Sequence, residues 1–504
     1  MKLNSLILLA TATAQLATSS ASSHGKFTTS EDSQSIPLIN HGDFFGIEVE
    51  VGNPAQKVQL LLDTGSDQTW IPSIRGSKCS KNYANKDGKN YQCGSYGTYL
   101  ERSSTSSNIT WDDFSVKYLD GSSAEGKMAY DDLRIGSSGG KGNHRMLLKD
   151  AQFGSGRKTH DSMSMGVLGL SLSTFQNSQE GFASFDRENI VHQMKKQGLI
   201  QRSIFSVWLN KHQTEAGSIL FGAYDLEKFT GTLKTLKMVN TNEKYGSYDP
   251  VLNYEVVISN LYLRTPENFN KTLKTTGFDF FEKLESYSNA YISAIFDTGS
   301  YYTYFPESIY DVMIEYLEPY IVEKDGAVFL ECSESREVSE MFEITLKFGT
   351  TVIAVPFDFL IDHVDSTAKI KQNGIDYCKL NVKPLVGMNT DKYNEKIILG
   401  QGLLRSMYTV YDLDKFEISV APARFTKAFN ILNVTVQHGL VGEYDGPVDE
   451  LLLPDVYDQK TDFILNTREN GFMKPLRNDG SSSQFNVGFF SLLGLSLLST
   501  FVYL

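Results

Sequence analysis

The sequence has few of the residues that build metal sites, redox centres and disulfide-rich scaffolds. Its 504 residues include only eight His, four Cys and three Trp. The His residues show no metal-type spacing, and no glycine-rich segment has the pattern of a phosphate-binding loop. No Cys is left over as a nucleophile if the four form two disulfides. We therefore expect neither a metal nor another cofactor.

Positive charge is also scarce. Lys and Arg number 47 against 60 Asp and Glu, which gives a net charge of −13. Nucleic-acid binding generally needs a basic surface, so we expect no nucleic-acid partner. Hydrophobic residues make up 41% and charged residues 21%, which is typical of a globular chain. The length allows two or three domains, or one large enzyme with two lobes.

Both ends of the chain have targeting patterns. Residues 1–21 place Lys2 before an apolar run and then small residues, which predicts a secretory signal peptide. Residues 479–504 combine a polar spacer with a final apolar run, which predicts a glycosylphosphatidylinositol (GPI) signal with attachment at Asn478 or Gly480. An ordinary transmembrane anchor is the alternative. We expect secretion to the cell surface, with membrane attachment through the lipid.

A secreted chain favours disulfides over metal sites for its cysteines. Three pairings are possible, and we favour the one in which each pair falls within one half of the chain: Cys79–Cys93 and Cys332–Cys378. Three Asn-x-Ser/Thr sequons predict N-glycosylation in the secretory pathway, at Asn108, Asn270 and Asn433.

An internal duplication is the strongest organisational signal. Asp-Thr-Gly-Ser at 63–66 recurs at 297–300, 234 positions later, and each copy follows an apolar run. An apolar pair ending in Gly follows each aspartate, at Gly169 and at Gly400, after 106 and 103 residues. Two matched motifs at nearly equal spacing indicate that the chain consists of two related halves.

The local patterns are mainly those of strands and turns. Alternation over 47–51 and over 114–118 predicts half-buried strands, and Asp120-Gly121 predicts a tight hairpin turn. Helical patterning is limited to 189–197 and 308–318. We therefore expect a mostly β fold.

We divide the chain between its two ends into four segments. A short pro-segment or N-terminal extension is predicted over 22–40. Two lobes related by a pseudo-twofold axis follow, over 41–238 and 239–425. Periodicity fades and acidic clusters appear after them, so 426–478 is predicted to be a stalk.

Paired Asp-Thr-Gly motifs indicate peptide hydrolysis. Two carboxyl groups sharing one proton can activate water with the ionised member and polarise a carbonyl with the protonated one. Asp63 and Asp297 are our candidates for this pair. The Gly residues would let backbone amides approach, the Thr residues would join the two loops, and the Ser hydroxyls would bond the outer carboxylate oxygens. These supporting residues are Thr64, Gly65, Ser66, Thr298, Gly299 and Ser300.

The segments 63–72 and 118–126 resemble the first active-site loop and the flap of the pepsin family of aspartic proteases. The resemblance extends from about Phe44 to Pro422 and is greatest to the yeast surface proteases called yapsins. It implies a bilobal pepsin-like fold with a central cleft for an extended polypeptide substrate. We expect a monomeric aspartic-type endopeptidase.

The same resemblance assigns roles around the flap. It implies that Tyr118 is the flap tyrosine, that Trp70 is its hydrogen-bonding partner, and that Asp120 and Gly121 form the flap turn. Resemblance to yapsins also implies cleavage next to Lys or Arg. Asp120 and Glu125 could favour such a basic side chain, although Asp120 could instead only stabilise the turn.

Several positions depart from the family pattern. Asp67 and Tyr301 stand where small or hydroxyl residues are common, and Gln401 stands where Asp often follows the second glycine motif. An acidic or small residue is also usual near Met165. The pro-segment is short and has no dibasic pair. The alternative to an active enzyme is therefore a catalytically weak or inactive binding or adhesion protein of the cell surface.

Overall fold

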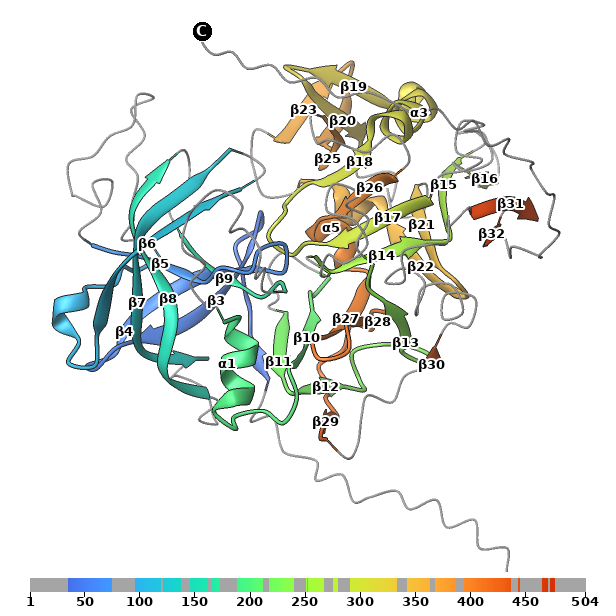
Figure 1. Ribbon diagram of the computed structural model, residues 1–504. Helices are drawn as coiled ribbons and strands as arrows, with labels where there is room; N and C mark the ends of the chain where they lie inside the picture. The colour runs from blue at the N-terminus through green and yellow to red at the C-terminus, as the bar shows by residue number, and fades with distance from the viewer. Residues whose placement is uncertain are drawn as a thin grey trace, which may run out of the picture.

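The two predicted halves fold into two β-sheet lobes that share a central sheet (Figure 1). The computed structural model describes residues 35–74, 96–118, 121–136, 146–160, 165–172, 188–211, 217–239, 251, 253–266, 275–279, 291–332, 342–362, 368–386, 394–436, 443–444, 465–469 and 472–475.

The first half is built on an eight-stranded sheet. The order of pairing is β2 (Ile39–Asn40), β3 (Phe45–Val51), β4 (Gln56–Asp63), β9 (Gly166–Gly169), β5 (Trp70–Pro72), β8 (Met146–His160), β7 (Ser123–Ile135) and β6 (Asn108–Lys117). The strands predicted over 47–51 and 114–118 lie in β3 and at the end of β6. Side chains of β4 alternate between buried and less buried toward its carboxyl end, which fits a strand with one face on the core.

The second half repeats the central part of this arrangement. Its five-stranded sheet pairs β14 (Glu255–Ile258), β17 (Tyr291–Phe296), β26 (Asn394–Leu399), β18 (Thr303–Pro306) and β25 (Val382–Leu385). In the first half, β9 lies between β4, which is parallel to it, and β5, which is antiparallel. In the second half, β26 lies between β17, which is parallel to it, and β18, which is antiparallel. The duplication in the sequence is thus a duplication of strand topology.

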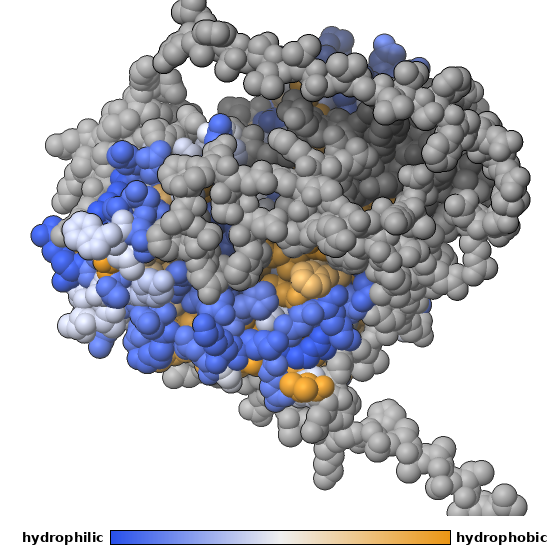
Figure 2. Space-filling model, in the orientation of Figure 1, coloured by the Kyte–Doolittle hydropathy of each residue, from blue (hydrophilic) through white to orange (hydrophobic). Residues whose placement is uncertain are grey.

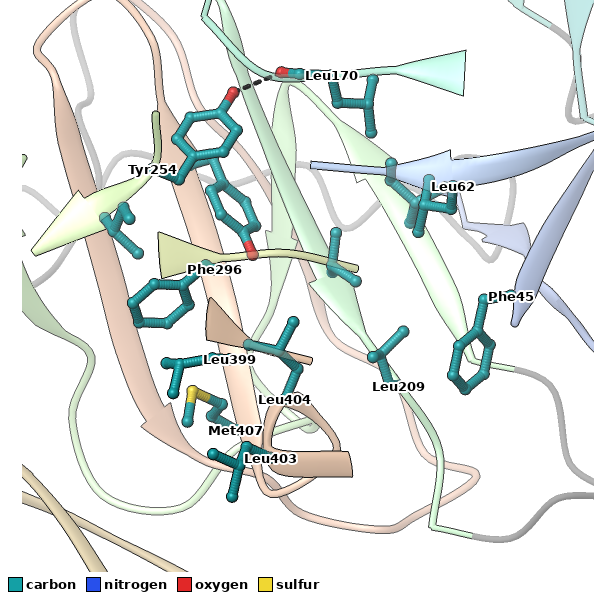
Figure 3. Packing of buried hydrophobic residues seen from close by; sticks show 14 of the residues in the cluster. Phe45, Leu62, Leu170, Leu209, Tyr254, Phe296, Leu399, Leu403, Leu404 and Met407 are labelled. Atoms are coloured by element: carbon teal, nitrogen blue, oxygen red, sulfur yellow. Dashed lines mark hydrogen bonds between the residues drawn. The ribbon is translucent and has the colours of Figure 1, made fainter. Parts of the chain in front are cut away.

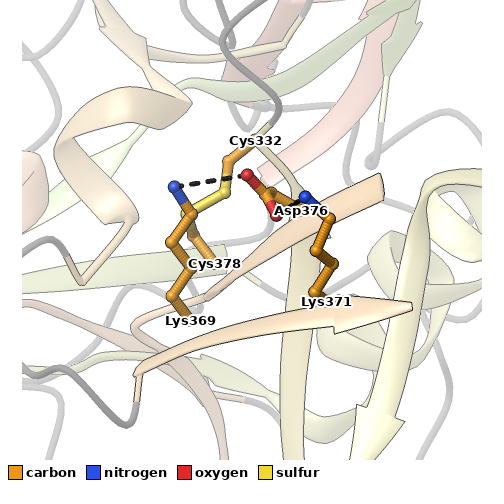
Figure 4. Close-up of a disulfide and its surroundings, with 5 residues drawn as sticks. All are labelled: Cys332, Lys369, Lys371, Asp376 and Cys378. Atoms are coloured by element: carbon orange, nitrogen blue, oxygen red, sulfur yellow. Dashed lines mark ion pairs between the residues drawn. A yellow bond between two sulfur atoms is a disulfide. The ribbon is translucent and has the colours of Figure 1, made fainter. Parts of the chain in front are cut away.

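Two four-stranded sheets complete the second lobe. One pairs β16 (Thr275–Asp279), β15 (Asn260–Pro266), β21 (Glu343–Phe348) and β22 (Thr351–Pro356). The other pairs β19 (Ile321–Lys324), β20 (Ala327–Glu331), β24 (Ile375–Lys379) and β23 (Lys369–Gln372). A disulfide joins Cys332, just after β20, to Cys378 in β24 (Figure 4).

Strands from both halves form the central seven-stranded sheet. Its order is β1 (Ile36–Pro37), β11 (Ser218–Phe221), β10 (Ile204–Trp208), β27 (Met407–Asp412), β28 (Glu417–Pro422), β13 (Lys234–Lys237) and β30 (Glu443–Tyr444). Antiparallel pairing of β10 with β27 joins the two halves directly. The hydrophobic core is also continuous between them, since Phe45 and Leu62 belong to the same cluster as Phe296, Leu399 and Met407 (Figure 3).

Two α-helices lie where the sequence predicts them, and a further short one was not predicted. Helix α1 (Ile190–Lys196) begins after Asn189, whose side chain accepts a hydrogen bond from the N–H of Val191 at 2.7 Å. Helix α3 (Glu307–Leu317) buries Ile309, Met313 and Leu317 on one face. A third short helix, α5 (Gln401–Leu404), follows β26.

Strands that pair with the two lobes also form within the predicted pro-segment and the predicted stalk. Residues at the end of the predicted pro-segment form β1 and β2, and Ile36 is almost fully buried against the central sheet. The first part of the predicted stalk is also folded, because β29 (Ile431–Asn433) pairs with β12 (Ala223–Asp225). Later in that segment, β31 (Leu465–Glu469) pairs with β32 (Phe472–Pro475). Strands this short contain too few residues for the alternation of apolar and polar side chains to be recognised in the sequence.

The face of the molecule in Figure 2 is mainly hydrophilic where it is coloured, and hydrophobic residues there form small separate areas. Within the described ranges, no helix combines the length and the apolar character that a bilayer crossing requires.

Candidate active site

Both Asp-Thr-Gly loops leave the ends of equivalent strands. Asp63 is the last residue of β4 and pairs with Gly169 of β9, while Asp297 directly follows β17. A Cβ on Gly169 would lie 2.6 Å from the backbone of the first loop. A Cβ on Gly400 would lie 2.2 Å from the carbonyl oxygen of Tyr302 in the second loop. Each glycine motif therefore lets one aspartate loop pass close to the neighbouring strand.

The two aspartate carboxyls face one another across the boundary between the lobes. A Cβ on Gly65 would lie 2.5 Å from Cγ of Asp297, and a Cβ on Gly299 would lie 2.4 Å from Oδ1 of Asp63. Each carboxyl thus occupies the space left by the glycine of the opposite motif. The exposed fraction is 4% for Asp63 and 9% for Asp297, so the pair is largely shielded from water yet not closed off.

Each carboxyl is held by hydrogen bonds from its own loop. The N–H of Gly65 donates to Oδ1 of Asp63 at 2.7 Å, and the Ser66 hydroxyl donates to Oδ2. The N–H of Gly299 donates to Oδ1 of Asp297 at 2.9 Å, and the Ser300 hydroxyl donates to Oδ2 at 2.7 Å. The two oxygens of each carboxyl therefore have fixed and different partners.

The threonines connect the loops across the lobes. The N–H of Thr64 donates to Oγ1 of Thr298 at 3.0 Å, and the N–H of Thr298 donates to Oγ1 of Thr64 at 3.0 Å. Each hydroxyl then donates to the main chain of the other lobe, to Phe296 at 2.7 Å and to Leu62 at 2.8 Å. Both threonines are buried, so these four bonds rigidly fix one loop against the other.

Burial and mutual repulsion favour the protonated form of this pair. Burial first and then the charge of the nearby Asp297 raise the pKa of Asp63 to about 7, against the lowering effect of the hydrogen bonds from Ser66 and Gly65. Burial also raises the pKa of Asp297, while hydrogen bonds from Ser300 and Gly299 oppose the rise. A pair of this kind retains a shared proton well above the ordinary pKa of an aspartate.

A hairpin from the first lobe reaches this site. The indole N–H of Trp70 donates to the Tyr118 hydroxyl at 2.8 Å, and Tyr118 also hydrogen-bonds the side chain of Ser66. Gly121, at φ +86°, allows the tight turn that the sequence predicts, with its N–H donating to the Tyr118 carbonyl at 3.1 Å. Tyr118 is thereby linked to the Asp63 carboxyl through Ser66.

Some predicted residues are not brought to the site or lie outside the described residues. Asn108 is exposed at the start of β6, and Asn433 is partly buried in β29. Glu125 lies on β7, with its carboxylate 3.7 Å from the Lys158 ammonium. The predicted residues outside the described ranges are Cys79, Cys93, Asp120, Asn270, Asn478 and Gly480.

The unusual residues Tyr301 and Gln401 both touch the second loop. Gln401 is buried and donates through Nε2 to the Thr298 carbonyl at 2.9 Å. Its amide therefore supports the loop without adding a carboxylate beside Asp297. Tyr301 hydrogen-bonds the side chains of Asp362 and Asn381.

The sequence analysis did not identify the residues that hydrogen-bond the backbone next to the aspartate pair. The Tyr254 hydroxyl donates to the Leu170 carbonyl at 2.6 Å (Figure 3). The Leu170 N–H in turn donates to the Asp63 carbonyl at 2.8 Å. Tyr254 comes from the second half and lies 84 positions from Leu170. No local pattern marks it, because its role depends on the pairing of distant strands.

The described residues contain no group of three or more His, Cys, Asp or Glu side chains that could hold a metal ion. The two carboxyls are the titratable pair at the centre of the site. Their facing arrangement, separate serine donors and cross-linked loops provide the groups needed to activate water on one side of an amide and polarise the carbonyl on the other.

Comparison with solved structures supports the same fold. An aspartic proteinase from Irpex lacteus matches 79% of this chain and 99% of its own, with a TM-score of 0.55 and 20% sequence identity. The family model described as eukaryotic aspartyl protease matches residues 44–423. The chain belongs to this family and is an aspartic-type endopeptidase.

The similar curated proteins are fungal enzymes of this type. A probable aspartic-type endopeptidase opsB from Aspergillus fumigatus is 30% identical over 402 residues, covering 79% of this chain and 73% of the relative. Yapsin-3, an aspartic proteinase from Saccharomyces cerevisiae, is 29% identical over 396 residues, covering 77% and 68%. Secreted aspartic protease 10 from Candida albicans is 28% identical, covering 79% and 76%.

Proposed function

We propose that Asp63 and Asp297 are the catalytic pair and hydrolyse a peptide bond through a water held between them. The observation that carries this proposal is the meeting of the two carboxyls across the lobe boundary, each against the glycine of the opposite motif. The ionised carboxyl removes a proton from the water as it attacks the peptide carbonyl. The protonated carboxyl donates to the carbonyl oxygen and stabilises the tetrahedral intermediate.

The intermediate then collapses with loss of the amine. The carboxyl that received the water proton delivers it to the leaving nitrogen, and the C–N bond breaks. Because water itself forms the new bond to the carbonyl carbon, no covalent enzyme intermediate is needed, and the pair ends with one proton, as it began. This cycle requires two carboxyls with different protonation states, which the raised pKa values of the pair support.

Tyr118 is proposed to position the substrate over the pair. Its hydroxyl is fixed by Trp70 at 2.8 Å, and it lies on the hairpin between β6 and β7. An extended peptide beneath this hairpin could pair with its backbone in the manner of an added strand. The hydrogen bonds that link Tyr118 to the Asp63 carboxyl through Ser66 support this role.

The proposed setting is the cell surface, with a GPI anchor and transit through the secretory pathway. The signal-like residues 1–21 and the apolar end 479–504 support it. The name of the similar Candida albicans protein also describes a secreted protease. A phosphatidylinositol-specific phospholipase C should release the full-length protein from membranes, whereas a transmembrane anchor would require detergent for release.

A separate proposal concerns substrate specificity: cleavage next to Lys or Arg. Resemblance to yapsins suggests it, and yapsin-3 is among the similar proteins. Glu125 is a poor candidate for the recognition residue because Lys158 lies 3.7 Å from its carboxylate. A peptide library cut by the enzyme should show enriched Lys or Arg beside the scissile bond. An even distribution would refute this preference.

Substitution of the pair tests the catalytic proposal. The full-length chain is expressed through a eukaryotic secretory pathway as wild type, Asp63→Asn and Asp297→Asn, and hydrolysis of a denatured protein is followed at acid pH. Each variant should lose about 10²- to 10⁴-fold in rate while thermal unfolding remains cooperative. Asp113→Asn is a matched control, since that carboxylate is exposed on β6. Activity retained in Asp297→Asn would contradict the proposal.

A further inference from the structure

An aromatic segment continues directly from the second aspartate loop. Ser300 donates to Asp297, and the next two residues are Tyr301 and Tyr302. The rings of Tyr301 and Tyr302 are 5.1 Å apart, and those of Tyr302 and Tyr304 are 6.3 Å apart, both in edge-to-face contact. All three tyrosines are partly exposed. This segment is the part of the second loop that departs from the family pattern, and the proposed mechanism does not use it.

Two lysines flank the middle tyrosine. The ammonium of Lys383 lies 3.7 Å from the ring centroid of Tyr302, and that of Lys379 lies 5.6 Å from it. The lysines come from strands β25 and β24, and the pairing of β18 with β25 sets Tyr304 opposite Lys383. Lys383 is exposed and Lys379 is partly exposed. We call Tyr302, Lys379 and Lys383 the basic patch.

The basic patch differs from other lysine clusters of this lobe. Lys369 and Lys371 both lie within 4 Å of the Asp376 carboxylate (Figure 4). Among the described residues, neither Lys379 nor Lys383 lies within that distance of a carboxylate. In a chain with a net charge of −13, two lysines that have no carboxylate within 4 Å among the described residues form a local positive site beside the second loop.

Tyr301, the residue before Tyr302, has hydrogen-bonding partners of its own. The hydroxyl of Tyr301 hydrogen-bonds Asp362, whose side chain is buried, and also Asn381. Burial and the bond to Asp362 raise the pKa of Tyr301, so this tyrosine stays a neutral donor. The nearby buried Arg405 adds positive charge on this side. The Asp362 carboxylate is therefore bonded to Tyr301.

We infer that the basic patch is a subsite for an acidic side chain of the polypeptide substrate. The inference rests on the proposed function, because it places the scissile bond at Asp63 and Asp297. An extended substrate advances about 3.3 Å per residue. Tyr302 is two residues beyond Ser300, and the lysine side chains extend further. The acidic residue would therefore lie about two to four positions from the scissile bond, with its carboxylate near Lys383 and its methylenes on the Tyr302 ring.

The size of the effect follows from the exposure of the lysines. Ion pairs at exposed sites contribute modestly, and two lysines act here on one carboxylate. We expect a peptide with Glu at the matching position to have a kcat/KM about three- to tenfold above that of the same peptide with Gln. The preference should vanish at a pH where the substrate carboxyl is protonated, below about 4.

The test compares matched peptides on matched variants of the full-length enzyme. Peptides differing only in Glu, Gln or Lys at each of the positions two to four residues on either side of the cut are assayed at about pH 5.5. Wild type, Lys383→Met, Lys379→Met and Lys383→Glu are compared with Lys371→Met. The last variant removes a lysine that is already near Asp376, so it should keep the full Glu preference.

The inference predicts that Lys383→Met loses most of the Glu/Gln ratio and that Lys383→Glu prefers Lys at the same position. Each variant should also unfold cooperatively close to the wild-type temperature, which a misfolded variant would not show. No Glu preference in the wild type, or an unchanged ratio in Lys383→Met, overturns the subsite while leaving the protease assignment intact. Hydrolysis that survives Asp297→Asn would instead overturn the proposed function.

Discussion

Replacing the hydroxyl of Thr298 should loosen the two aspartate loops without touching either carboxyl. This hydroxyl accepts from the Thr64 N–H at 3.0 Å and donates to the Leu62 carbonyl at 2.8 Å. Thr298→Val keeps the branched shape and removes both bonds. Because the side chain is buried, water does not replace them. A buried group left without its partner costs about 1–3 kcal/mol, and two groups lose theirs, so the unfolding free energy should fall by about 2–6 kcal/mol.

Catalysis should fall as well, since the carboxyls depend on this connection for their relative position. A displacement of about 1 Å at a reacting group can cost 10²-fold, so we expect kcat/KM to fall by about 10- to 100-fold. Thr298→Ser retains the hydroxyl and is the control. Urea unfolding of the full-length protein and peptide hydrolysis at acid pH measure the two effects. The reasoning is refuted if the Val variant matches wild type in both assays, or if Ser is as impaired as Val.

Two further predictions concern protonation and the flap. The pKa of Asp63 is raised from 3.8 to about 7 in the folded state. Between these pH values the folded protein therefore keeps a proton that the unfolded chain has released. The unfolding free energy should fall as pH rises through this window. The unfolding free energy is measured as a function of pH for the wild type and for Asp63→Asn. The value for the variant minus that for the wild type should increase by up to about 4 kcal/mol between pH 4 and 7. A difference that does not change with pH would contradict the prediction. Trp70→Phe removes the 2.8 Å bond to Tyr118 and should lower kcat/KM by about 3- to 30-fold, with a smaller effect in a Tyr118→Phe background. Additive losses in that double variant would contradict coupling of the two residues.

The repeated motifs allowed much of the dyad geometry to be predicted. The nearly equal spacings from Asp63 to Gly169 and from Asp297 to Gly400 reflect equivalent strand pairings, and these pairings bring the two aspartates together. The roles expected for the serines and threonines agree with the hydrogen bonds of the site because those bonds form within or between the two motifs. Short-range patterns also located helix α1, where Asn189 caps the first turn.

Features that depend on distant partners could not be predicted. The short strand β1 is recognisable only through its pairing with β11, and the segment after Pro422 only through the pairing of β29 with β12. The basic patch has the same origin, because Lys383 reaches Tyr302 through pairing of β25 with β18. A single lysine in sequence gives no sign of the ring it will contact.

The central claim is that Asp63 and Asp297 act as one unit, and a comparison of single and double substitutions tests it most directly. Rates of peptide hydrolysis are measured for Asp63→Asn, Asp297→Asn and the double variant, all shown to be folded. Two groups that share one proton are both required for each turnover, so the three rates should agree within about threefold. A double variant slower than either single variant by the full product of the two losses would show independent groups and contradict the shared-proton mechanism.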